Sequence, residues 1–225
     1  MQGFKPALHA GDVDPGLGPV RYAFPNATFP LGAVHELIYD GMENAAATVG
    51  FTAGILTALM QKGAVCVWVS STRNIFPPAL AAYGIVPEKV IFIQLQKEKD
   101  LLWTIEEALR CEGLAAVVGE TRELGFIASR RLQLAVEQSR VTGFILRQDP
   151  KKLNTTASVC RWKISSLPSI VEEDLPGIGF PCWDVQLLKV RNGHPGNWQL
   201  TWANGKFSPV YQKTALIRAQ HKKTG

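Results

Sequence analysis

The chain has 225 residues, of which 46% are hydrophobic and 19% charged, which is typical of a folded globular protein and unlike a disordered one. No apolar run approaches the ~20 residues of a membrane-spanning helix. The N-terminus lacks the apolar core of a signal peptide, so we expect a cytoplasmic protein without membrane contact. The net charge is +5, but residues 186–225 alone hold seven Lys and Arg and no acid, which leaves −2 on the rest. Such a basic segment favours an acidic partner, nucleic acid or protein, unless it is simply a solvated tail.

The first part of the chain is predicted to be an arm followed by a strand, a tight loop and a long helix. Residues 1–30 contain five prolines, and we expect an arm laid over the domain without regular structure. Apolar residues at 34–39 predict a short strand that stops at Asp40-Gly41. Apolar residues on two faces of 49–60 predict a helix buried between layers. Strand, loop and helix in this order are the context of a phosphate-binding P-loop, G-x-x-x-x-G-K-[ST].

Residues 41–48, GMENAAAT, occupy the eight P-loop positions but keep only part of the motif. Gly41 and Thr48 are in place, whereas Ala46 replaces the second glycine and Ala47 replaces the lysine. The Cβ of Ala46 resists the bend that a glycine allows. Without the lysine, a charge-assisted phosphate contact worth ~1.5–3 kcal/mol is lost. The sequence therefore predicts the architecture of a nucleotide site without its chemistry, and no cofactor.

The sequence also argues against a metal site. His35-Glu36 begins like the zinc motif H-E-x-x-H, but Tyr39 stands where the second histidine is needed. The segment also reads as a strand, on which positions i and i+4 do not project as they do on a helix. The four cysteines are far apart and form no C-x-x-C, so we interpret them as reduced thiols.

Downstream, strands and helices are predicted to alternate up to residue 146. Apolar runs rich in β-branched residues predict buried strands at 65–70, 90–94, 114–118 and 141–146, and apolar spacing predicts helices at 77–83, 98–110 and 126–138. Later strands are predicted at 158–165 and in a hairpin of 186–191 and 198–202. This pattern indicates an α/β fold: a mostly parallel sheet with helices on both faces and an antiparallel C-terminal extension.

This order, with the altered P-loop at its start, resembles the RecA-like core, and more closely the bacterial ImuA proteins, RecA relatives that act in mutagenic DNA repair. The most specific matching segments are ASRRLQLAVEQS and RNGHPG. Further segments extend the resemblance over most of residues 20–205: FPLGAVHEL, WVSSTRNIFPPALAAYGI, LLWTIEEALR, LAAVVGE and WDVQLLKVRNGHPGNWQLTW. We therefore divide the chain into an arm at 1–30, a RecA-like domain at 31–207 and a basic tail at 208–225.

The comparison with RecA places the ATPase acids at positions where this chain has none. The glutamate that activates water would fall near Thr72, and the acid that holds the metal would fall at Gly119, with Glu120 one residue further on. Together with the altered P-loop, these positions imply a protein that hydrolyses no nucleotide and is not an enzyme.

The two DNA-binding loops of RecA correspond here to residues 120–125, which lead into α-helical Arg130-Arg131, and to residues 147–156. Basic side chains contact phosphates without reading sequence. The resemblance makes six residues candidate contacts to single-stranded DNA: Arg122, Arg130, Arg131, Arg147, Lys151 and Lys152. The alternative is an ordinary basic surface, because neither loop holds the aromatic residues on which single-strand binders stack bases.

The resemblance implies an accessory role in SOS-induced, error-prone translesion DNA synthesis. Its implied partners are an ImuB-like Y-family polymerase homologue, RecA, a replicative-type polymerase subunit and single-stranded DNA. The alternative is a cell-division inhibitor of the SulA type, also RecA-like, which would bind FtsZ and no DNA. The C-terminal tail holds an apolar turn among basic residues, which we expect either to order on a partner or to remain solvated: Lys213, Leu216, Ile217, Arg218, Lys222 and Lys223.

Overall fold

One twisted sheet organises the molecule. The computed structural model describes residues 13–72, 75–150, 153–170 and 179–210. Within them the strands lie side by side in the order β3-β2-β4-β5-β1-β6-β7-β8-β9. Their bounds are β1 (Val34–Tyr39), β2 (Val65–Ser70), β3 (Val90–Gln94), β4 (Leu114–Thr121), β5 (Thr142–Gln148), β6 (Cys160–Ile170), β7 (Phe180–Val190), β8 (Gly196–Ala203) and β9 (Lys206–Pro209). The helices are α1 (Gly41–Leu59), α2 (Glu98–Leu109) and α3 (Phe126–Ser139).

The pairing changes once along the sheet, from parallel to antiparallel. Strands β1 to β5 pair only in parallel, and β6 pairs in parallel with β1 on one side and antiparallel with β7 on the other. Strands β8 and β9 continue the antiparallel part. The predicted fold class is therefore confirmed, with the refinement that β6 belongs to both parts.

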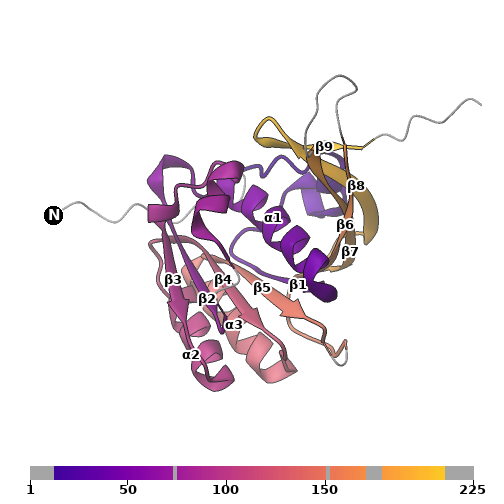
Figure 1. The fold of residues 1–225 in the computed structure, drawn as a ribbon. Coiled ribbons are helices and arrows are strands. Elements are labelled where there is room, and N and C mark those ends of the chain that lie inside the picture. The colour runs from indigo at the N-terminus through magenta and orange to yellow at the C-terminus, as the bar shows by residue number, and fades with distance from the viewer. Residues whose placement is uncertain (1–12, 73–74, 151–152, 171–178, 211–225) are drawn as a thin grey trace, which may run out of the picture.

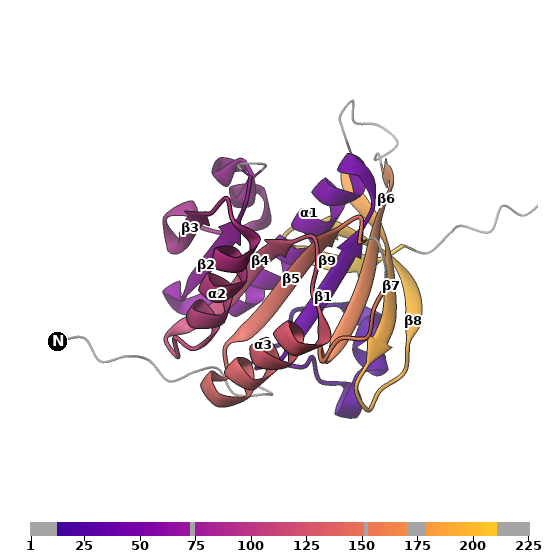
Figure 2. The same ribbon diagram turned by 90° about the horizontal axis from the view of Figure 1, so that it is seen from below.

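The helices lie on both faces of the sheet (Figures 1 and 2). Helix α1 covers one face, where Phe51 packs against Trp162 with ring centroids 5.9 Å apart. Helices α2 and α3 cover the other face, where Ile105 and Val136 join Ile145 of β5 in a second apolar cluster. Each apolar stripe predicted from the sequence thus faces the sheet.

The antiparallel strands curl around α1, which explains why that helix is apolar on two faces (Figure 1). A Cβ added at Gly54 would lie 2.5 Å from the Phe207 ring of β9. The absence of a side chain at this position therefore lets strand and helix approach closely. The edge of Phe207 also faces Trp202, with ring centroids 4.9 Å apart.

Several short segments differ from the prediction. The short helix predicted at 77–83 is present as the 3-10 helix η4 (Pro77–Tyr83). The arm has regular structure after all, because η1 (Gly18–Ala23) and η2 (Pro25–Ala27) lie within it and bury Val20. Two more 3-10 turns are η3 (Gln61–Gly63) and η5 (Pro87–Lys89). Strand β9 was not predicted, and it runs two residues into the predicted tail.

Candidate functional site

The tight loop predicted between the first strand and helix does not exist. Helix α1 begins at Gly41, so Asp40 alone separates it from β1. Gly41 has a φ of +68°, a left-handed conformation that glycine adopts at no steric cost, and the chain turns there. Three consecutive alanines then favour helix strongly. The P-loop positions are thus wound into the first two turns of α1, and no phosphate-wrapping loop remains in the described chain.

The side chain that would hold magnesium in a P-loop is committed elsewhere. Thr48 is fully buried, and its hydroxyl donates to the backbone carbonyl of Asn44 at 2.7 Å. The side chain of Asn44 joins this end of the helix to the residue that precedes it and to β6. Its Nδ2 donates to Asp40 Oδ1 at 2.8 Å, and its Oδ1 accepts from the Ser166 amide at 2.7 Å. The start of α1 is therefore fixed by contacts that leave no room for a wrapping loop.

The two positions at which an ATPase of this type has acids are Thr72 and Gly119 in this chain. Thr72 is exposed beyond the end of β2. A Cβ at Gly119 would collide with the side chain of Ile105 on α2, so an acid at this position would displace that side chain. Glu120, the next residue, is half-buried, and its Oε1 accepts from Trp68 Nε1 at 2.8 Å. Burial raises the pKa of Glu120. Among the described residues, no three His, Cys, Asp or Glu side chains gather as a metal site would require.

Two neighbouring cavities lie where a nucleotide would sit, at the carboxyl ends of β1, β4 and β5. One has about 330 Å³ and apolar walls from α1 and η4, and the other has about 260 Å³ and mostly polar walls. Both are lined by Tyr39, Glu120 and Gln148, which makes them two parts of one groove. The carboxyl edge of a parallel sheet is the usual place for a ligand site in such folds.

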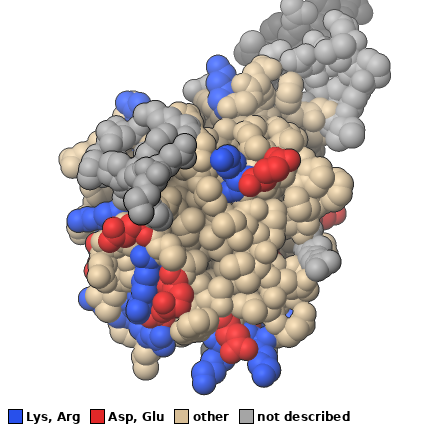
Figure 3. Space-filling model, turned by 90° about the vertical axis from the view of Figure 1, so that its left-hand side faces the viewer, with Lys and Arg blue, Asp and Glu red and all other residues tan. Residues whose placement is uncertain are grey.

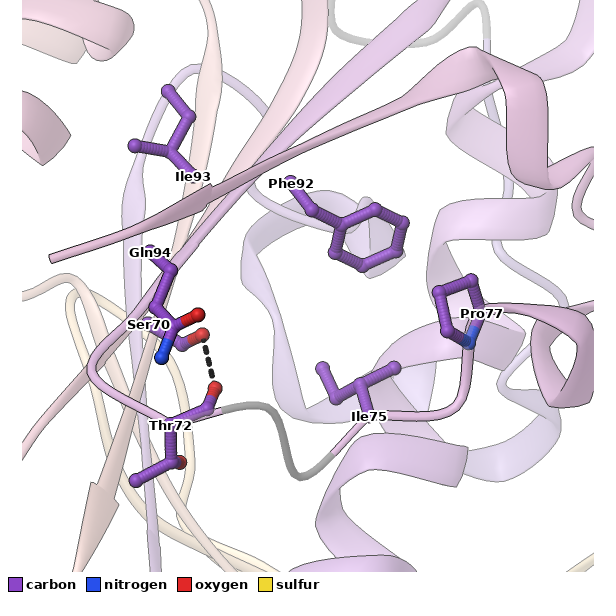
Figure 4. Close-up of a pocket in the computed structure, with 7 residues that line it drawn as sticks. All are labelled: Ser70, Thr72, Ile75, Pro77, Phe92, Ile93 and Gln94. Atoms are coloured by element: carbon purple, nitrogen blue, oxygen red, sulfur yellow. Dashed lines mark hydrogen bonds between the residues drawn. The ribbon is translucent and has the colours of Figure 1, made fainter.

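A larger cavity of about 450 Å³ lies beside this groove, at the ends of β2 and β3. Phe92, Ile75 and Pro77 turn toward the same space, and the Ser70 hydroxyl donates to the Thr72 carbonyl at 2.7 Å (Figure 4). Figure 3 views the molecule from the side of β3: uncharged atoms cover the centre of the face, and most charged side chains gather toward its lower edge.

The six residues predicted to contact DNA do not form one surface. Arg122 follows β4 and Arg130 lies on α3, and both are exposed. Arg131 is exposed too, but its guanidinium pairs with the buried carboxylate of Glu106. Lys151 and Lys152 lie outside the described residues. The six predicted partner contacts between Lys213 and Lys223 also lie there.

The prediction for Arg147 is wrong, because this side chain is fully buried. Its Nη1 lies 2.5 Å from Oε1 of Glu36, which is also fully buried. The other oxygen of Glu36 accepts from Arg161 Nε at 2.9 Å and from the Thr156 hydroxyl at 2.7 Å. Arg147 therefore neutralises a charge inside the protein and reaches no phosphate. The sequence analysis missed the role of Glu36, although an acid in the middle of the apolar strand VHELIY signals a buried basic partner.

Comparisons with known proteins bear on the family and the fold of this chain. The chain is 34% identical over 189 residues to the protein named ImuA in two strains of Caulobacter vibrioides, NA1000 and CB 15, covering 79% of this chain and 78% of each relative. Among solved structures, the RadB recombinase matches with a TM-score of 0.61 and 13% identity over 88% of this chain and all of that one. A KaiC-like protein from Pyrococcus horikoshii matches with a TM-score of 0.58 and 14% identity, over 90% of this chain and all of that one. No protein-family model matches the chain. Among the helices described, none is long and apolar enough to cross a membrane.

Proposed function

Because this chain belongs to the ImuA family, we propose that it is a non-catalytic accessory protein of SOS-induced, error-prone translesion DNA synthesis. It acts through contacts with other proteins, first with an ImuB-like Y-family polymerase homologue. RecA, a replicative-type polymerase subunit and single-stranded DNA are the further proposed partners. The site of action is the cytoplasm.

The observation that carries the non-catalytic part of the proposal is the start of α1. With Asp40 as the only residue between β1 and α1, backbone N–H groups do not form the cradle that P-loops build for phosphate. The Thr48 hydroxyl donates to the carbonyl of Asn44, and Ala47 supplies no charge. Without a phosphate-binding site, the protein would act by binding other macromolecules through its surface.

Direct contact with DNA involves fewer of the described arginines than the sequence suggested. Arg122 and Arg130 remain exposed candidates, whereas Arg147 is removed and Arg131 is paired. Within the described residues these two exposed arginines neutralise too few phosphates for tight binding by themselves, and Lys151 and Lys152 lie outside those residues. Protein contacts are therefore expected to dominate, with DNA held mainly through the partner.

The test is a mutation assay in the source bacterium. Deleting the gene should lower the frequency of damage-induced mutations, and a plasmid copy should restore it. A Thr48→Val copy should restore it fully, because Val fits the buried site and no magnesium depends on the hydroxyl. A deletion strain with normal induced mutagenesis but altered division after damage would overturn the proposal in favour of a SulA-like inhibitor of FtsZ.

A further inference from the structure

Three polar side chains line the interior of the groove at the carboxyl edge of the sheet: Tyr39, Glu120 and Gln148. Tyr39 is 8% exposed, lines both cavities, and its hydroxyl forms no hydrogen bond with a described residue. It lies opposite Gln148 in the register of β1 and β5. Glu120 completes the set with a carboxylate whose position is held by Trp68. Three hydrogen-bonding side chains thus converge on a space that opens onto apolar walls.

The charge around this groove is the opposite of what a phosphate needs. Glu120 and Glu98 line its polar part against a single described cation, the exposed Arg122. Burial in the first place, and the nearby carboxylates of Glu120 and Asp149 in addition, raise the pKa of Tyr39 to about 12. A phosphate would be repelled by these acids, whereas a cation entering the groove would be stabilised by them.

We infer that this groove binds a basic side chain, Lys or Arg, of another protein, with an adjacent apolar side chain of the same segment in the 330 Å³ cavity. The ammonium or guanidinium lies against Glu120, and the Tyr39 hydroxyl and the Gln148 carbonyl accept its remaining N–H groups. The alkyl stem passes along the apolar wall, as long basic side chains do.

The walls explain why the ligand is a protein segment and not a free amine. The apolar cavity is lined from α1 and η4, and Met42 and Phe76 at its rim are each 69% exposed. Large apolar side chains left exposed around a pocket mark a protein contact, because a small polar ligand would leave them in water. The inference concerns the site itself and does not depend on which protein of the translesion system supplies the segment.

The experiment uses the full chain labelled with ¹⁵N and three capped tetrapeptides. They are Gly-Leu-Arg-Gly, its analogue with neutral citrulline in place of arginine, and Gly-Leu-Glu-Gly. The indole N–H of Trp68 reports binding, because its acceptor is the carboxylate under test. The arginine peptide should shift this resonance. The citrulline peptide should bind at least about tenfold more weakly, because it can donate to the same carboxylate but lacks the positive charge of arginine.

Two variants give the matched controls. Glu120→Gln keeps an acceptor for Trp68 and removes the charge, so it should fold with an unchanged or higher melting temperature and weaken the arginine peptide by the same factor. Glu88→Gln removes an exposed charge on η5 and should change nothing. The inference is overturned if citrulline binds as well as arginine or if Glu120→Gln binds normally. It is also overturned if spermidine competes as well as the peptide, or if no peptide shifts Trp68 at millimolar concentration.

Discussion

The guanidinium of Arg147 lies 2.5 Å from the carboxylate of Glu36, and both side chains are completely buried. The pair joins β5 to β1 at the centre of the sheet, and Arg161 extends it to β6. Because an unpaired ion inside a protein is costly, removing one partner is worse than removing both. The pair therefore makes the pairing of these three strands specific.

We expect Arg147→Met to lower the free energy of unfolding by about 3 kcal/mol, because it leaves Glu36 with Arg161 as its only charged partner. The double variant Glu36→Gln/Arg147→Met should recover at least half of that loss. Urea denaturation measures both, and Arg130→Met, at an exposed position, serves as the control. Equal stability of the single and the double variant would contradict the prediction.

The burial of His35 should make the free energy of unfolding depend on pH. Its Nε2 donates to the Pro30 carbonyl at 2.7 Å, its Nδ1 accepts from Trp162 Nε1 at 3.3 Å, and burial lowers its pKa from 6.5 to about 4. The folded state thus prefers the neutral ring. The resulting stability is complete above pH 6.5 and is lost as the pH falls from 6.5 to about 4, by at most roughly 3 kcal/mol.

The measurement for His35 compares the wild type with His35→Phe in urea at several pH values between 7 and 4. The variant loses both hydrogen bonds and should be less stable at pH 7. Because Phe cannot titrate, the stability difference between the two proteins should shrink as the pH falls. A constant difference would show that His35 does not titrate in this range.

Gly54 tests how closely β9 approaches α1. A Cβ at this position meets the Phe207 ring, so Gly54→Ala should destabilise the protein by about 1–3 kcal/mol, although alanine is the better helix former. Phe207→Leu in the same chain should return part of the loss by making room. The thermal midpoints of the single and double variants give the answer, and a stabilised Gly54→Ala would contradict the observed packing.

The order of strands and helices was predictable because β-branched runs and glycine breakers are local signals. The ends of β6 and β7 were not, because Pro168 and Pro181 read as breakers, although a proline is tolerated at a strand irregularity such as the one between Leu167 and Ile170. The burial of Arg147 could not be predicted from the sequence either. Arginine side chains are usually exposed, and only the pairing of β5 with β1 shows that Arg147 shares a face of the sheet with Glu36.

Nucleotide binding is the next prediction. Calorimetry with magnesium-ATP should show no binding at micromolar concentration, because α1 provides no phosphate cradle. Restoring Ala46→Gly and Ala47→Lys together should not revive hydrolysis, since Thr72 supplies no activating acid and Gly119 supplies no acid to hold the metal. A micromolar dissociation constant for the wild type would show that another group replaces the lysine.

The last prediction concerns the basic C-terminal segment, whose residues 211–225 lie outside the described part of the chain. Strand β9 ends at Pro209, and the Val210 amide still donates to the Gln199 carbonyl at 2.9 Å. Truncation after Val210 keeps all of β9 and this hydrogen bond, so we expect the melting temperature to stay unchanged. If the apolar turn around Leu216 and Ile217 anchors the ImuB-like partner while the basic residues steer it, the truncated protein should lose binding in a pull-down with that partner.

A Leu216→Asp variant should lose binding as the truncation does. The variant Lys222→Gln/Lys223→Gln should slow association and make it less sensitive to salt, while the anchor still holds. Unchanged binding of the truncated protein would place the partner interface on the folded domain instead.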